Sequence, residues 1–137
     1  MKSIFVVCVS ALALCTVLAA QNPAVSEKQS GISVQLPVAN QAVAMPDAEQ
    51  NDATVVTVSA RGDLYVGTQP ITVGEISGLR ASTVYVKADA RAPYQDVLSV
   101  LSALIGHRVV LLTEANVKAA SDTITPPYGV SVTVAIQ

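Results

Sequence analysis

The segment between residues 83 and 113 constrains the fold of this chain more than any other. Two apolar stretches, Thr83–Ala88 and Val109–Thr113, have the composition of β-strands. Between them, Pro93 suits the first turn of a helix, and Gly106 suits the position after its last turn. A strand, a helix and a second strand in one sheet need a crossover connection, which is right-handed by default.

The helix within this segment is predicted to be amphipathic. Its apolar residues recur at the i, i+3, i+4 and i+7 spacing of one helical face. These residues are Tyr94, Val97, Leu98, Leu101, Leu104 and Ile105. We expect this face to cover a sheet.

A strand and a hairpin are predicted earlier in the chain. Ile32–Leu36 alternates apolar and polar residues and is followed by Pro37, which predicts a short strand with one buried face. Val55–Ser59 and Leu64–Val66 are predicted to pair as a hairpin, with Gly62 supplying a positive φ in the tight turn.

A first helix is predicted to begin near residue 73. Thr72 and Glu75 have the spacing of a capping box, and Ile71 can pack against Ile76 as a hydrophobic staple. Two glycines in this stretch lower helix stability by about 1 kcal/mol each relative to Ala, so the helix should be short.

The remaining segments are predicted from their composition. Asn40–Ala53 contains Pro46 and many small or polar residues, which predicts a loop or linker. Residues 115–128 are predicted to form a polar loop ending in two prolines. From residue 130 onward, valine and isoleucine alternate with small or polar residues, which predicts a half-buried strand.

These elements predict an α/β (α+β) two-layer sandwich. A small mixed sheet would carry two helices on one face. This domain would occupy residues 32–137, after a polar tether at residues 21–31 and an N-terminal hydrophobic segment.

The hydrophobic segment at residues 1–20 indicates export. Lys2 is its only charged residue, and small residues follow Leu18 at a possible cleavage point. The segment is compatible with a cleaved signal peptide and with an uncleaved membrane anchor. Cys8 and Cys15 both lie in it, so the exported part has no cysteine and no disulfide.

Composition argues against several function classes. Lys and Arg number 8 against 10 Asp and Glu, so the basic surplus of a nucleic-acid-binding protein is missing. Aromatic residues make up 4% of the chain and Trp is absent, which disfavours stacking on bases or sugars. His107 is the single histidine, and it is better explained as a residue at a helix C-terminus than as a catalytic base. We therefore expect no enzyme activity, no cofactor and no metal site.

Other candidate residues have simple structural interpretations. Arg61-Gly62-Asp63 spells an adhesion tripeptide but is expected to form only the hairpin turn. Asp89 and Asp96 lie near the start of the second helix, where negative charge is favourable. Tyr94 is either an aromatic at the edge of the core or a contact for a peptide or partner chain.

Sheet edges offer a different kind of function. A small open sheet can dimerise or accept an extended peptide. The predicted strand Ile32–Leu36, which contains Val34 and Leu36, is separated from the later strands by a long linker and could exchange between subunits.

Several segments resemble the periplasmic domain of the ExbD/TolR family, the membrane-anchored partners of proton-driven envelope motors. The stretch Ile32–Pro37 resembles the family's alternating strand that ends in Leu-Pro. The stretch Val84–Val97, with its Ala-Asp and Pro-Tyr pairs, resembles the family's strand and helix start. The resemblance covers roughly residues 32–114, and Val109–Thr113 matches the strand that follows.

The resemblance implies an N-terminal anchor, a periplasmic domain and dimerisation. It implies an ExbB/TolQ-like membrane partner, together with a TonB/TolA-like protein or peptidoglycan. On this basis we expect an accessory subunit of a transport or envelope-integrity complex in the bacterial cell envelope. Asp89, Tyr94, Val34 and Leu36 are its candidate partner-binding residues.

The chain departs from the family pattern at its N-terminus. The family's membrane helix carries an aspartate that takes part in proton passage, whereas residues 4–20 contain no Asp or Glu. Since proton relay needs an ionisable group in the bilayer, we expect no direct proton coupling. The alternative hypothesis is a soluble or tethered periplasmic module that binds peptidoglycan or a peptide. The first helix is also shorter than the family's, and the tail from Ala115 is longer and adds a strand.

Overall fold

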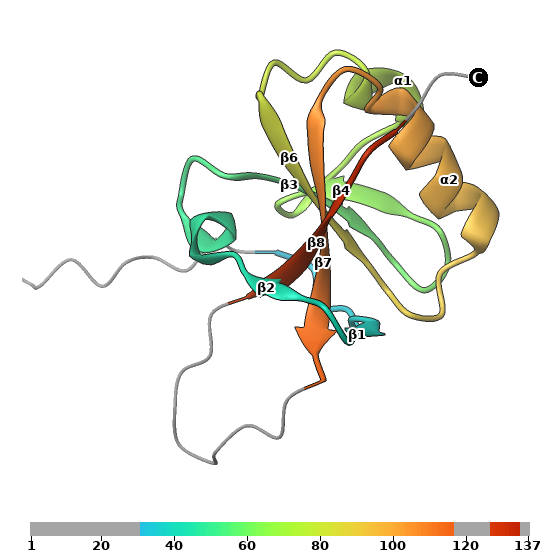
Figure 1. The fold of residues 1–137 in the computed structure, drawn as a ribbon. Helices are drawn as coiled ribbons and strands as arrows, with labels where there is room; N and C mark the ends of the chain where they lie inside the picture. Colours follow the sequence, from blue (N-terminus) through green and yellow to red (C-terminus); the bar gives the residue numbers. More distant parts are fainter. Residues whose placement is uncertain (1–30, 117–126, 135–137) are drawn as a thin grey trace, which may run out of the picture.

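The computed structural model describes residues 31–116 and 127–134, which form a mixed sheet with helices against it (Figure 1). The strands are β1 (Val38–Ala39), β2 (Val43–Ala44), β3 (Thr54–Val58), β4 (Leu64–Val66), β5 (Gln69–Pro70), β6 (Thr83–Ala88), β7 (Arg108–Ala115) and β8 (Tyr128–Val132). The helices are the 3-10 helix η1 (Pro46–Glu49) and the α-helices α1 (Val73–Ile76) and α2 (Tyr94–Ala103). The predictions for residues 1–30, for most of the loop at 115–128 and for the last three residues lie outside the described residues.

Three parallel strands form the centre of the sheet. The strand order is β2-β8-β7-β6-β3-β4-β5, and β1 pairs with the C-terminal end of β7. β6 is parallel to both β3 and β7, while the remaining neighbours along this order are antiparallel. Because β6 and β7 are parallel, the chain between them must cross back over the sheet, and α2 makes this predicted crossover.

Both α-helices pack on the same face of the sheet, as predicted. The register sets Val56 beside Val86, so valines of neighbouring strands project toward the helices together. Ile76 of α1 and Val100 of α2 are fully buried against them. The buried members of this core are Val56, Val58, Ile76, Val84, Val86, Ala88, Val100, Leu104 and Val109.

A smaller apolar cluster lies on the opposite face of the sheet. It contains Tyr85, Val110 and Leu112 from the central strands and Ala48 from η1. Leu36 is among the half-buried residues that pack against this cluster. The second face is therefore covered by short N-terminal segments instead of by an α-helix.

The predicted hairpin and helix ends are confirmed. β3 and β4 pair antiparallel, and Gly62 in their turn has a φ of 90°. The Thr72 side chain accepts a hydrogen bond from the Glu75 backbone, and the Glu75 side chain accepts one from the Thr72 backbone. This reciprocal capping box starts α1. Gly106, with a φ of 94°, follows α2.

The predicted apolar face of α2 is partly wrong. Leu104 has no exposed surface, and Val97 and Leu101 are half-buried against the core. Val100, which the prediction left out, is also fully buried. Tyr94, Leu98 and Ile105, which the prediction placed on the core face, are 77%, 39% and 41% exposed. The spacing rule joined two adjacent stripes of α2 into one, and only packing against the sheet separates them.

Two N-terminal predictions also need correction. Ile32–Leu36 is extended, and its alternate side chains are half-buried as predicted, but it is not a strand. Its neighbour β6 already has β3 on one side and β7 on the other, so no free edge remains for a ladder. Asn40–Ala53 is not only a loop, because it contains β2 and η1. β2 pairs with β8, which is too distant in sequence for local composition to reveal.

We predict that Gly129→Ala will destabilise the protein. A Cβ at Gly129 of β8 would lie 2.7 Å from Val110 Cγ1 and 3.1 Å from the Leu111 carbonyl oxygen. Val110 is buried and the Leu111 carbonyl belongs to the backbone of the sheet, so neither can move away freely. This overpacking should lower the unfolding free energy by about 1–3 kcal/mol. Urea unfolding followed by circular dichroism measures this loss.

Gly74→Ala is the matched control for this prediction. A Cβ at Gly74 of α1 would meet only the Thr72 hydroxyl, at 3.9 Å. Alanine has the higher helix propensity, so this change should leave stability unchanged or raise it by up to about 1 kcal/mol. Equal midpoints for Gly129→Ala and the unmodified chain would contradict the packing argument.

Candidate partner-binding site

The carboxylate of Asp89 accepts four hydrogen bonds. Oδ1 accepts hydrogen bonds from the Arg91 backbone amide and from Arg91 Nε, both at 2.9 Å. Oδ2 accepts hydrogen bonds from Arg91 Nη2 and from the backbone amide of Gln35, both at 3.0 Å. All four bonds favour the ionised carboxylate over the neutral acid.

The surroundings of Asp89 hold it in its charged form. The Asp89 residue is 5% exposed, whereas the Arg91 side chain is 67% exposed. The hydrogen bonds from the Arg91 side chain, followed by those from the Arg91 and Gln35 backbones, lower the pKa of Asp89 far below its usual value. The side-chain hydrogen bonds to Asp89 and the negative charge of Asp89 raise the pKa of Arg91. A nearly buried carboxylate with its donors in place is a structural anchor.

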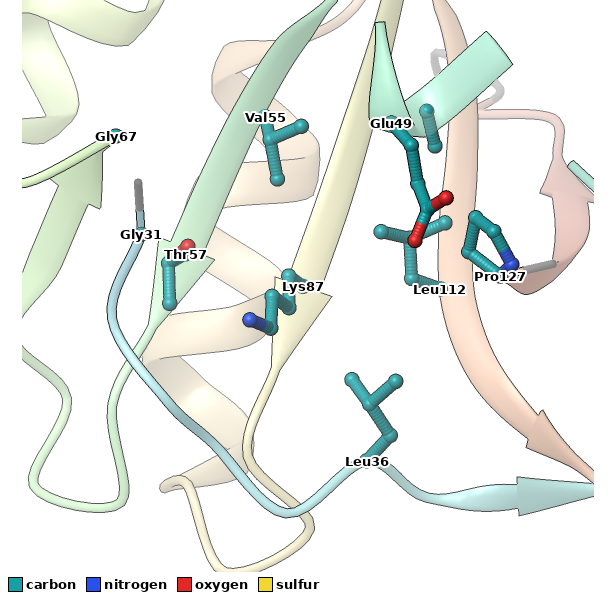
Figure 2. A pocket seen from close by; sticks show the side chains of 10 residues that line it. Gly31, Leu36, Glu49, Val55, Thr57, Gly67, Lys87, Leu112 and Pro127 are labelled. Carbon is teal, nitrogen blue, oxygen red and sulfur yellow. The ribbon is translucent and has the colours of Figure 1, made fainter. Parts of the chain in front are cut away.

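Asp89 ties an N-terminal segment to the sheet. We call residues 31–37 the strap, because they run in extended form beside β3 and β6 (Figure 2). Gln35 in the strap donates to Asp89, and its carbonyl accepts from the Ala90 backbone at 2.7 Å. At the strap's start, Lys87 Nζ donates to the carbonyl of Ile32 at 2.9 Å. Separate hydrogen bonds, instead of a β-ladder, therefore hold the strap.

A cavity of about 280 Å³ lies between the strap, β3, β6, β7 and η1. Leu36 from the strap, Val55 from β3 and Leu112 from β7 supply much of its apolar lining. Figure 2 shows the Leu36 side chain turned toward this space. Thr57 and Glu49 add polar groups to its wall. The cavity can accept a small apolar side chain beside a hydrogen-bonding group.

The structure brings three of the four predicted partner-binding residues into one region. Val34 and Leu36 flank Gln35 in the strap, and Gln35 is bonded to Asp89. Val34 and Leu36 are both half-buried. Tyr94 lies elsewhere, on the first turn of α2, with its side chain 77% exposed.

Three residues of this region did not stand out in the sequence. Gln35 acts through its backbone, which no side-chain pattern could indicate. Arg91 lies two residues after Asp89, a spacing at which an arginine can fold back onto a carboxylate, so its role had a local signal. Lys87 reaches a segment 55 residues away, and only the tertiary fold brings these two together.

His107 and the Arg61-Gly62-Asp63 turn both make contacts within the fold. His107 Nδ1 lies 2.8 Å from the Ala81 carbonyl oxygen, in the connection after α2. In the Arg61-Gly62-Asp63 turn, the Ser59 hydroxyl accepts hydrogen bonds from the backbone amides of Arg61 and Asp63. Within the described ranges, no three His, Cys, Asp or Glu side chains are grouped so that they could hold a metal ion.

Comparison with known proteins identifies one family. The family model for the biopolymer transport protein ExbD/TolR matches residues 3–116. The chain belongs to the ExbD/TolR family. The match ends at residue 116, so β8 lies beyond it. No curated protein and no solved structure matches the chain.

Family membership gives a coarse function. ExbD/TolR proteins are non-catalytic accessory proteins of the cell envelope, and they generally work with ExbB/TolQ and TonB/TolA partners. Membership therefore indicates an accessory role in biopolymer transport. None of the helices within residues 31–116 and 127–134 has the length and apolar character needed to cross a membrane.

We predict that Asp89→Asn will lower stability in a pH-dependent way. The folded-state pKa of Asp89 is depressed, so its stabilising contribution is present above the unfolded-state pKa of about 4 and is lost as the pH falls below it. The amide variant cannot accept four hydrogen bonds with full charge. Thermal unfolding at several pH values should give a lower melting temperature for Asp89→Asn at pH 7, and the difference should narrow below about pH 4.

Asp52→Asn serves as the control for the pH experiment. Asp52 is an exposed residue in the loop before β3. This variant should unfold like the unmodified chain at pH 7. The melting temperatures of Asp89→Asn and the unmodified chain could instead differ by the same amount at every pH down to 3. That result would contradict the depressed pKa of Asp89.

Proposed function

We propose that this protein is a non-enzymatic, inner-membrane-associated accessory subunit of a transport or envelope-integrity complex. Residues 1–20 would anchor it, and the sheet domain would face the periplasm. It would dimerise and bind an ExbB/TolQ-like membrane protein together with a TonB/TolA-like protein or peptidoglycan. The observation that carries this proposal is the family match, which begins at residue 3 and so joins the hydrophobic segment and the folded body in one unit.

The strap and the cavity beside it are our candidate for partner contact. Val34 and Leu36 present half-buried apolar side chains beside the anchor at Asp89. Separate hydrogen bonds hold the strap, including those with Asp89 and Lys87. The strap cannot join the sheet beside β6, because β6 already pairs with β3 and β7. A partner that contacts this region would meet an apolar surface bordered by Glu49 and Lys87. Exposed Tyr94 would offer a separate contact on the helical side.

A second function is favoured by one observation. Residues 4–20 lack any Asp or Glu, whereas proton relay in a membrane needs an ionisable side chain. This absence favours a tethered, or cleaved and soluble, periplasmic module that binds peptidoglycan or a peptide without a motor role. The two proposals differ in whether residues 1–20 remain attached and whether a membrane partner is bound.

We predict that the native chain retains Met1, fractionates with membranes and co-purifies with a co-expressed ExbB/TolQ-like protein in detergent. Intact-mass spectrometry and subunit stoichiometry of the purified complex measure these outcomes. The ExbB/TolQ-like protein carrying an unrelated single-span protein is the control. A soluble chain that starts near Gln21 would remove the anchored proposal in favour of the periplasmic module.

Substitution at the strap tests the contact surface separately. Leu36→Ala removes an apolar side chain from the cavity wall, so binding of a TonB/TolA-like periplasmic domain should weaken. Val73→Ala, on exposed α1 surface away from the strap, is the matched control and should bind normally. Binding measured by calorimetry that is equal for both variants would contradict the role of the strap.

A further inference from the structure

The cavity beside the strap combines charges of both signs with an apolar wall. Lys87 of β6 and Glu49 of η1 both line it, and Figure 2 shows these two side chains on different sides of the space. Leu36, Val55 and Leu112 supply apolar surface to the same cavity. A ligand that fills it would therefore meet a positive charge, a negative charge and a hydrophobic surface.

Thr57 places a hydroxyl beside the positive charge. Thr57 and Lys87 are paired residues of the neighbouring parallel strands β3 and β6, so their side chains project from the same face of the sheet. Thr57 is 2% exposed and lines the cavity, and its hydroxyl forms no hydrogen bond with any residue in the described ranges. A nearly buried polar group without a partner is costly, so a ligand acceptor here would be favoured. A hydroxyl next to an ammonium suits a carboxylate.

The two charges are held in position by separate parts of the fold. Lys87 Nζ donates to the carbonyl of Ile32 at 2.9 Å, so the strap fixes the ammonium beside the cavity. Glu49 is the last residue of η1, and the preceding residue, Ala48, is buried in the apolar cluster of this face. Because the charges are arranged without a ligand, a ligand of matching charge would pay little ordering entropy for them.

The size of the cavity limits the ligand. Its volume of about 280 Å³ equals that of about nine water molecules at about 30 Å³ each. It therefore suits a molecule of about ten non-hydrogen atoms, which is the size of a single amino acid. An amino acid with an apolar side chain also carries the three groups that the walls call for, which are a carboxylate, an ammonium and a hydrophobic part.

We propose that the cavity binds a free α-amino acid with an apolar side chain. Its carboxylate would accept a hydrogen bond from Thr57 and lie beside the Lys87 ammonium. Its ammonium would donate to Glu49, and its side chain would pack on the apolar wall that includes Leu36. This inference goes beyond the partner contact proposed for the strap, because the ligand is a small molecule that needs no second protein.

Calorimetric titration of the full chain tests the ligand chemistry. The chain is purified in detergent without other proteins and titrated with L-leucine up to about 10 mM, which covers millimolar and tighter binding. L-Leucine should give a saturable isotherm. L-Leucine amide lacks the carboxylate and 4-methylpentanoate lacks the ammonium, so each should bind about tenfold or more weakly. Glycine lacks the apolar side chain and should also bind more weakly.

Two substitutions test the assigned wall residues. Thr57→Val removes the hydroxyl at nearly constant shape, and Glu49→Gln removes the negative charge from an exposed residue. Each should weaken L-leucine binding by about tenfold or more. Thr54→Val at the start of β3 and Glu114→Gln on the exposed surface of β7 make the same changes outside the cavity lining and should bind normally. Circular dichroism melting confirms that all four variants fold.

The outcomes decide the proposal without reference to a protein partner. The absence of L-leucine binding up to about 10 mM overturns it. Equal affinity for L-leucine and 4-methylpentanoate, or unchanged affinity in folded Thr57→Val and Glu49→Gln chains, also overturns it. Binding of L-leucine that both wall variants weaken and both control variants keep supports it. Because no second protein is present, failure of the TonB/TolA-like binding test would leave this result standing.

Discussion

The parallel pairing of β6 with β7 is the constraint on which the rest of the structure depends. Parallel neighbours cannot be joined by a tight turn, so the chain must cross one face of the sheet, and α2 occupies that face. The opposite face is left to the segments before β3, from which the strap and η1 pack against it. Because no α-helix covers this face, its apolar cluster is small and a cavity remains beside the strap.

Asp89 connects this arrangement to its N-terminal part. It lies directly after β6, where the crossover begins, and its carboxylate bonds a strap residue 54 positions earlier in the chain. Arg91 supplies three of the four hydrogen bonds and the compensating charge. The ionised state of one nearly buried side chain thus links the strap to the start of the α2 crossover. The cost of desolvating this carboxylate is offset by direct hydrogen bonds.

The strap and its cavity lie on the face of the sheet away from the α-helices. Family membership indicates an accessory role in biopolymer transport, and proteins of this family generally work with ExbB/TolQ and TonB/TolA partners.

Local sequence determined the hairpin turn at Gly62, the capping box at Thr72 and the crossover through α2, because backbone conformation and short-range hydrogen bonds set these features. It also indicated the region around Val34, Leu36 and Asp89, through family resemblance. Tertiary structure alone decided that Ile32–Leu36 is a strap instead of a strand, since β6 has no free edge. It also decided that Val100 of α2 is buried and Leu98 is exposed, because burial depends on where the sheet lies and not on helical spacing alone.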